Sequence, residues 1–169
     1  MDDWNQLFTQ HADAVWRTAY RIVGNTADAD DTMQDVFVEA VGMNGSTKVR
    51  NWSALLRRLT TVRALDRLRR HIREKNKSSN WIDWDSLPST DASPDAKFAR
   101  GELSWRLRWA LSCLPEQQAE AFCLRHVEDM SYEDIAGQLM VSVNSIGVIL
   151  HRARERLREL LQESAALKR

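Results

Sequence analysis

Apolar side chains near the amino terminus recur every three or four residues, which is the period of an α-helix. In residues 2–23 this spacing is kept by Leu7, Phe8, His11, Val15, Ala19 and Ile22. Gly24 and Asn25 follow directly, and both residue types are typical of a helix end. The pattern therefore predicts a first helix over residues 2–23.

A second helix is predicted from Thr26 to about Val41. Its apolar side is formed by Met33, Val36, Phe37, Ala40 and Val41. The opposite side carries Asp30, Asp31, Gln34, Asp35 and Val38. Residues 42–51 contain two Gly, two Asn and a Ser, which favours a loop before the next helix.

A third helix is predicted to begin near Asn51 or Trp52, and it combines an apolar stripe with dense positive charge. Seven arginines and one histidine lie between Arg57 and Arg73. Long basic side chains can extend outward while the helix buries its other side. The stripe consists of Trp52, Leu55, Leu56, Leu59 and Val62, and then shifts to Leu65, Leu68 and Ile72.

The helical pattern is interrupted after this basic segment by a polar, Ser-rich stretch with Pro88. Its composition predicts a flexible linker over residues 76–96. Trp81, Ile82 and Trp84 are unusual there, because aromatic side chains gain free energy when they leave water. They either pack back on a domain or dock on a partner, and we favour packing.

The carboxyl-terminal part predicts several short helices and one longer one. Ser93-Pro94 and Pro115 are typical helix starts, and Ser131 with Asp134 resembles a capping box. Val141 and Ser142 form a turn before a last helix, in which Ser142 is the predicted cap. A short helix, a tight turn and a longer helix constitute a helix-turn-helix pattern. The predicted inward positions of the last helix are Ile146, Leu150, Ala153, Leu157 and Leu160.

These elements predict an all-α fold with two small helical domains, 1–75 and 97–169, joined by the linker 76–96. The content of only six Gly and three Pro in 169 residues agrees with a helical chain. No stretch approaches the roughly 18 apolar residues of a membrane span, and the amino terminus lacks the pattern of a signal peptide. Two cysteines form no disulfide framework. We therefore expect a cytoplasmic protein with no membrane association.

Formal net charge is zero, but the charges are sorted into blocks along the chain. Residues 1–45 hold two basic and eight acidic side chains, whereas residues 46–77 hold eleven basic and two acidic ones. Residues 78–140 are again acidic and residues 141–169 basic. Such sorting allows one surface to bind phosphate and another to bind a protein. The alternative is a set of solvated helix faces.

No catalytic pattern is present: the sequence has no Gly-rich phosphate loop, no nucleophile elbow and no zinc-protease motif. Cys123 and His126 are three residues apart on a predicted helix. Two ligands without a second pair are a weak metal signal, so ordinary packing is the favoured interpretation. We expect neither an enzyme, nor a metal site, nor a cofactor.

Three segments of the chain together resemble the extracytoplasmic-function (ECF) group of bacterial RNA polymerase sigma factors. The similar segments are 26–39, 54–70 and 114–161, in the order and at the separations of that family. The most specific pieces are Asp28-Ala29 with Asp31, Gln34 and Phe37; Asp66 with Arg69; Leu114-Pro115-Glu116; Ser131-Tyr132-Glu133-Asp134-Ile135-Ala136; and Arg152-Ala153-Arg154 with Leu157-Arg158.

The resemblance implies a sigma factor that binds core RNA polymerase and directs promoter-specific initiation. Its first domain would bind polymerase through Asp28, Asp31, Gln34, Asp35 and Phe37. The same domain would hold melted minus-ten DNA with Asn44, Ser46, Lys48, Arg50, Trp52, Arg57, Arg58, Val62, Arg63, Arg67 and Arg70. The second domain would bind the minus-thirty-five element with Ser142, Asn144, Ser145, Val148, His151, Arg152 and Arg154.

Departures from the family pattern change the expected DNA readout. The family commonly has Asn where this chain has Val62, and Lys-Ser-Arg where it has Gly147-Val148-Ile149. It also often has Gly at the position of Met140. We therefore expect altered minus-ten selectivity and a recognition helix that attracts DNA less strongly.

Two other interpretations remain. In one, the chain still binds polymerase, but its second domain contacts a protein such as an anti-sigma factor, since Val148 and Ile149 would expose apolar surface. In the other, the chain is a stand-alone helix-turn-helix regulator. The polymerase-binding motif at 28–37 argues against the second of these.

Overall fold

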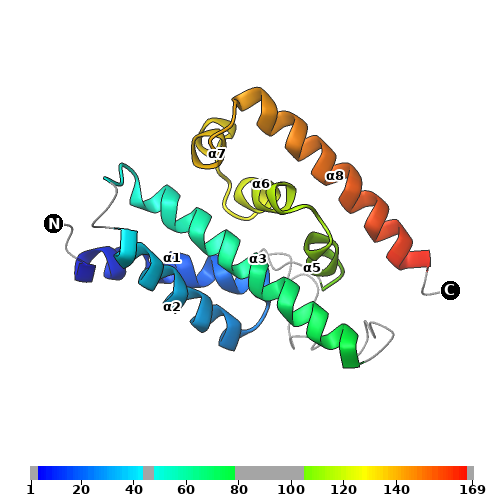
Figure 1. Ribbon diagram of the computed structural model, residues 1–169, viewed down its shortest axis with the longest axis horizontal. Helices are drawn as coiled ribbons and strands as arrows, with labels where there is room; N and C mark the ends of the chain where they lie inside the picture. Colours follow the sequence, from blue (N-terminus) through cyan, green and yellow to red (C-terminus); the bar gives the residue numbers. More distant parts are fainter. Residues whose placement is uncertain (1–3, 44–47, 79–104, 167–169) are drawn as a thin grey trace.

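The computed structural model describes residues 4–43, 48–78 and 105–166, and every regular element in these ranges is an α-helix (Figure 1). The all-α class is therefore confirmed. The predicted positions Asn44, Ser46, Trp81, Ile82 and Trp84 lie outside the described residues, as does the predicted cap Ser93-Pro94. The helices are α1 (Trp4–Val23), α2 (Thr26–Met43), α3 (Trp52–Ser78), α5 (Trp105–Ser112), α6 (Glu116–His126), α7 (Tyr132–Leu139) and α8 (Val143–Ala166).

The first three helices pack against one another, and local signals set their ends. Gly24 adopts a positive φ of 80°, and its N–H donates to Tyr20 O at 2.8 Å, which ends α1. Asn25 caps α2, since its Oδ1 accepts the Asp28 N–H at 2.8 Å. Asn51 caps α3 by accepting the Ala54 N–H at 3.0 Å. The predicted helix starts are thus confirmed.

Two details of the first half differ from the prediction. Val41 was expected on the apolar side of α2 and Phe8 on that of α1, but both are exposed. They border an apolar groove that is lined by residues of α1 and α2. In addition, α3 continues to Ser78, into the segment 76–96 that composition predicted as linker, because its basic residues also favour helix.

The second half has the predicted helix-turn-helix. Ser131 caps α7 by accepting the Asp134 N–H at 3.1 Å, and Ser142 caps α8 by accepting the Ser145 N–H at 3.2 Å. Between them, Met140 takes the left-handed conformation with φ 56°. The predicted inward positions Ile146, Leu150, Ala153, Leu157 and Leu160 are all buried.

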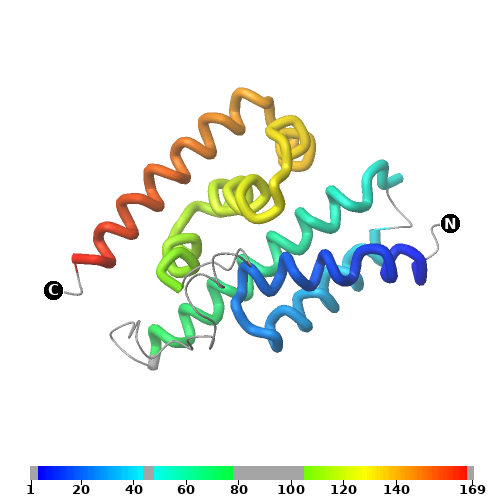
Figure 2. Tube along the Cα trace, turned by 180° about the vertical axis from the view of Figure 1, so that it is seen from behind, coloured from blue at the N-terminus to red at the C-terminus, as the bar shows by residue number. Residues whose placement is uncertain are grey.

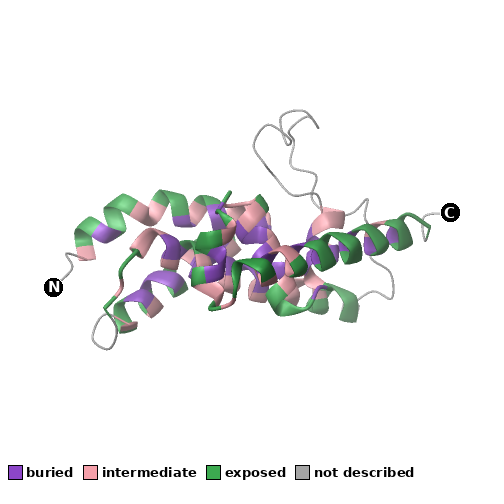
Figure 3. Ribbon diagram, turned by 90° about the horizontal axis from the view of Figure 1, so that it is seen from above, coloured by how far each residue is buried: buried purple, intermediate pink, exposed green. Residues whose placement is uncertain are grey.

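The two halves share a hydrophobic core and are packed against each other. Its largest cluster joins Ile22 of α1 and Leu65 and Leu68 of α3 to Leu111 of α5 and Leu157 of α8. Helix α6 lies between α3 and α8 (Figures 1 and 2). Buried positions gather where the halves meet, while the outer side of α8 is exposed (Figure 3). Helix α3 therefore serves as the central support for both halves.

Candidate functional site

The acidic side of α2 faces solvent as predicted for Asp31, Gln34 and Asp35. Asp28 is half-buried at the start of the helix. Phe37, in contrast, is buried, and its ring centroid lies 4.8 Å from that of Phe8. The structure therefore brings four of the five predicted polymerase-binding positions to an accessible surface. The fifth is chiefly a packing residue that lines the apolar groove.

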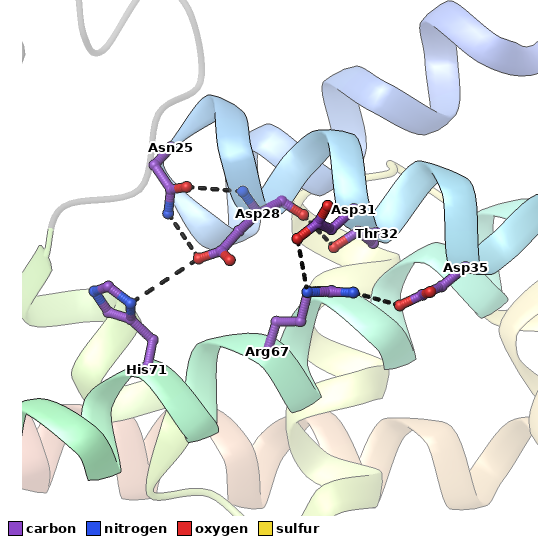
Figure 4. A network of polar contacts seen from close by, with 7 residues as sticks. All are labelled: Asn25, Asp28, Asp31, Thr32, Asp35, Arg67 and His71. Atoms are coloured by element: carbon purple, nitrogen blue, oxygen red, sulfur yellow. Dashed lines mark hydrogen bonds and ion pairs between the residues drawn. The ribbon is translucent and has the colours of Figure 1, made fainter.

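Arg67 of α3 connects directly to this acidic side (Figure 4). Its Nη2 lies 2.5 Å from Asp35 Oδ2 and its Nη1 lies 3.4 Å from Asp31 Oδ2. The Arg67 side chain is only 18% exposed. Asp28 has separate partners, because Asn25 Nδ2 donates to Asp28 Oδ2 at 2.8 Å and His71 Nδ1 lies 4.0 Å from the same oxygen. The predicted protein-binding acids and the predicted DNA-binding helix are thus electrostatically coupled.

Three of the four other predicted phosphate-binding arginines of α3 are also in ion pairs with acidic residues. Arg63 Nη2 lies 2.7 Å from Glu39 Oε2, and this hydrogen-bonded carboxylate raises the pKa of Arg63 above its ordinary value. Arg58 Nε lies 2.7 Å from Glu120 and Arg57 Nε lies 3.6 Å from Glu128. Arg70 is exposed and has no ion pair within residues 4–43, 48–78 and 105–166. A cationic surface exists, but most of its charge is already paired.

The remaining predicted minus-ten positions divide into packing and surface residues. Trp52 is half-buried against the first-half core, with its ring centroid 5.5 Å from that of Trp4. Val62 is half-buried. Lys48 and Arg50 are exposed just before α3. Trp52 therefore packs as its place in the apolar stripe indicated.

The start of α8 presents an open reading face. Asn144, Val148, His151, Arg152 and Arg154 are exposed, and Ser142 is occupied in the cap. His151 lies 3.8 Å from Glu155, and Arg154 donates to the Tyr132 hydroxyl at 3.3 Å. A Cβ added to Gly147 would meet nothing within 4 Å, so the absence of a basic side chain there is not imposed by packing.

Ile149 was expected beside Val148 on the exposed face, and this expectation is wrong. Its side chain packs against the cluster that contains Ile135, Ile146 and Leu150. Ile149 is one residue, about 100° of helix rotation, away from Val148 and Leu150, so it falls at the edge of the buried side. The exposed apolar side chains in this region are Met140 in the turn and Val143 and Val148 at the start of α8.

Sequence reasoning missed three polar residues that join the halves: Arg108, Glu120 and Glu128. Arg108 is only 5% exposed, and its guanidinium contacts carbonyl oxygens of α1. A signal was available, since Arg108 lies three residues after Trp105 and three before Leu111, within an apolar stripe. A charged residue at such a position is rarely buried without a partner.

The titratable side chains of α6 fit a packing role. Burial raises the pKa of Cys123 to about 12, so the thiol stays protonated. Burial and then the charges of Arg154 and Arg125 lower the pKa of His126, whose ring lies 4.5 Å from Phe122. In the described part of the chain no three His, Cys, Asp or Glu residues are grouped as metal ligands. None of the described helices is long and apolar enough to cross a membrane.

Comparisons with known proteins define the family. Residues 7–74 match the family model of Sigma-70 region 2, and residues 104–157 match that of Sigma-70, region 4. The chain is 32% identical to the RNA polymerase sigma-E factor of Streptomyces avermitilis, over 95% of this chain and 86% of that one. It is also 32% identical to the ECF RNA polymerase sigma factor SigE of Mycolicibacterium smegmatis, over 98% of this chain but only 64% of the relative.

A solved structure agrees with these matches. The sigma factor RpoE of Bartonella quintana, determined in complex with the anti-sigma factor NepR, aligns with a TM-score of 0.55 and 25% identity over 96% of this chain and 98% of that one. The fold and both regions are those of a sigma factor. This chain belongs to the ECF RNA polymerase sigma factors, which are non-catalytic subunits that direct transcription initiation. The resemblance stated from sequence is confirmed, and the stand-alone regulator is set aside.

Proposed function

We propose that the acidic side of α2 is the surface through which this sigma factor binds core RNA polymerase. Asp31, Gln34 and Asp35 support this assignment, because they are exposed on one side of a helix whose other side is buried. The apolar groove beside them, lined by Phe8, Met33, Phe37, Val38 and Val41, extends the surface. An apolar centre with a polar edge is the usual composition of a protein interface.

The basic side of α3 is the proposed path for melted minus-ten DNA, within the unit 1–75. Arg63 and Arg70 border a polar depression next to Asp66. Arg57 and Arg58 lie nearer the start of the helix, on the sides that face Glu128 and Glu120. Guanidinium groups bind phosphate oxygens through paired N–H donors. Val62 supplies no hydrogen bond to a base, so readout in this unit depends more on the backbone than on base edges.

The start of α8, within the unit 97–169, is the proposed reader of the minus-thirty-five element. Asn144 and Ser145 can hydrogen-bond to bases or phosphates, Val148 can contact a thymine methyl group, and Arg152 can reach the backbone. The alternative is that this domain contacts a protein. The exposed apolar side chains of Met140, Val143 and Val148 favour this alternative. An anti-sigma factor is the proposed partner of that kind, since RpoE was solved with one. The protein would work in the cytoplasm, together with polymerase.

The test is reconstitution of the full chain with core polymerase and a promoter library, with run-off transcripts as the readout. Specific transcripts are expected. Polymerase binding without initiation would favour the protein-binding alternative for the second domain.

The docking surface is tested separately with the double variant Asp31→Lys and Gln34→Ala. It should no longer co-purify with core polymerase, while its helical circular dichroism stays unchanged. Asp13→Lys makes the same charge reversal on α1, at a highly exposed site that forms an ion pair with Arg17. This control should bind core polymerase like the wild type, and equal retention of both variants would reject the acidic surface.

A further inference from the structure

Basic side chains gather on one side of the helix-turn-helix, where α6, α7 and α8 meet. Arg154 of α8 donates from Nη2 to the Tyr132 hydroxyl of α7 at 3.3 Å. Arg125 of α6 lies over the same ring, with its Cζ 5.7 Å from the ring centroid. Tyr132 itself packs against the buried cluster that contains Ile135 and Leu150. A tyrosine fixed by packing therefore keeps two guanidinium groups from different helices close together.

His126, the last residue of α6, adds a third basic group. The residue is exposed, and its ring centroid lies 4.5 Å from that of Phe122, one turn earlier on the same helix. This ring contact limits how far the imidazole can move. The guanidinium charges of Arg154 and Arg125 both act on the imidazole. Arg125, His126 and Arg154 together are called the basic cluster below.

Acidic groups offset the basic cluster only weakly. Asp129, just after α6, lies 3.5 Å from Arg125 Nη1, but its side chain is 95% exposed, so water weakens this pair. Arg125 also donates from Nη1 to Met130 O at 2.9 Å, which leaves other N–H groups of the guanidinium available. Within the described ranges, neither Arg154 nor His126 is in an ion pair. The basic cluster can therefore accept an anion without losing a buried ion pair.

The place of the basic cluster identifies the anion. In a helix-turn-helix bound to DNA, the recognition helix enters the major groove and the preceding helix crosses the sugar–phosphate backbone. Tyr132 is the first residue of that preceding helix, α7. Arg154 follows Gly147 of the reading face by seven residues, or about two turns, and so lies on the same side of α8. A backbone phosphate of duplex DNA is thus the anion expected at this place.

The imidazole of His126 responds to such an anion. Burial and then the charges of Arg154 and Arg125 lower the pKa of His126, so the imidazole is mostly uncharged near pH 7 in the free protein. A phosphate beside the two guanidinium groups offsets their charge and favours the protonated imidazole. The pKa of His126 is therefore higher in the complex than in the free protein, and binding takes up a proton from solvent.

We propose that His126 joins Arg125, Tyr132 and Arg154 in holding one backbone phosphate beside the minus-thirty-five element, and that its imidazole becomes protonated when this phosphate binds. The inference rests on the proposed role of α8 in DNA binding and adds pH to the conditions that control it. Affinity for duplex DNA rises as the pH falls through the range in which the bound imidazole takes up its proton. It levels off where the imidazole of the free protein is protonated as well.

The test measures binding of the full chain to a rhodamine-labelled duplex of mixed sequence by anisotropy, because backbone contacts do not depend on sequence. The wild type should bind about fivefold more tightly at about pH 5.8 than at about pH 7.5, at constant salt. His126→Gln removes the charge and should lose most of this change. His126→Lys keeps a permanent charge and should bind at the higher pH about as tightly as the wild type does at the lower one.

Two other histidines set the comparison. His151 of the reading face can add a pH dependence of its own, so the decisive quantity is the difference between the wild type and His126→Gln. His11→Gln removes an imidazole from α1 and should keep the pH dependence of the wild type. Equal pH dependence of the wild type and His126→Gln would overturn the proposal.

The protonation itself is measured by nuclear magnetic resonance, as a pH titration of the imidazole signals with and without unlabelled duplex. The His126 signal is assigned by its loss in His126→Gln, and its pKa should rise when duplex is added. An unchanged pKa in the bound protein would reject the proposal. Failure of the proposed role of α8 looks different, since Asn144→Ala with Arg152→Ala would then leave duplex affinity unchanged at both pH values, and this outcome would overturn both.

Discussion

Helix α3 and helix α8 are both proposed to bind DNA, yet their candidate DNA-binding side chains have opposite surroundings. On α3, Arg57, Arg58, Arg63 and Arg67 are all in ion pairs with acidic residues. On α8, Asn144, Val148 and Arg152 stand open at the surface, on a face poor in charge. DNA binding by these arginines of α3 would therefore displace ion pairs, whereas DNA binding by Asn144, Val148 and Arg152 of α8 would displace no ion pair of the described residues.

Arg67 gives the strongest test of this difference, because it joins α3 to Asp31 and Asp35 of α2. Arg67→Met keeps much of the buried stem and removes the charge. The free energy of unfolding should fall by about 1.5 kcal/mol, which lies between the usual contributions of an exposed and a buried ion pair. This intermediate value is expected because Arg67 is mostly buried, whereas the carboxylates of Asp31 and Asp35 are half-exposed or more. Urea unfolding followed by circular dichroism measures the change.

The matched control is Arg70→Met, on the same helix but without an ion pair in the described part of the chain. It should leave stability within about 0.5 kcal/mol of the wild type, while both variants weaken binding of single-stranded DNA. Equal stability of the two variants would mean that pairing on α3 does not support the fold.

The open face of α8 can be tested by adding the charge that it lacks. A Cβ at Gly147 would meet nothing within 4 Å, and the variant Gly147→Lys places a cation next to the predicted reading positions. Binding of duplex promoter DNA should become about fivefold to tenfold tighter near 0.1 M salt, and the slope of log K against log salt should steepen by about 0.9. A salt titration by anisotropy measures both quantities.

Gly147→Ala separates charge from helix propensity. It should stabilise the fold by about 1 kcal/mol, as expected for Gly in a helix interior, without a change in the salt slope. If Gly147→Ala steepened the salt slope as much as Gly147→Lys, the higher affinity for duplex DNA would come from ordering of α8 and not from the added charge.

The same contrast explains how far sequence reasoning reached. Periodicity and capping rules depend on neighbours within one helix, so they predicted the caps Ser131 and Ser142 and the buried side of α8. They also predicted which side of α2 carries Asp31 and Gln34. Errors arose at the edges of stripes, at Val41 and Ile149, where one residue of rotation decides between core and solvent.

Contacts between helices distant in sequence lay beyond such rules. The partner of Arg58 is 62 residues away and that of Thr18 is 110 residues away. Periodicity predicted that the arginines of α3 avoid the apolar stripe, but not that acids of α2 and α6 would pair with them. Pairing of this kind depends on how the helices pack, and a one-dimensional charge pattern contains no information on that geometry.

Met140 provides the smallest and most local test, at the turn that leads into α8. It is 89% exposed and left-handed, with φ 56°, a conformation that costs a side-chain-bearing residue about 1–2 kcal/mol. Met140→Gly removes this strain but makes the unfolded chain more flexible, so the net gain in unfolding free energy should be about 0.5 kcal/mol. Met140→Ala keeps the strain and should give no gain. Because the reading face of α8 is separate from the contacts that hold the fold, duplex binding should be the same in all three proteins. A change in affinity that follows the change in stability would show that α8, like α3, uses its DNA-binding side to support the fold.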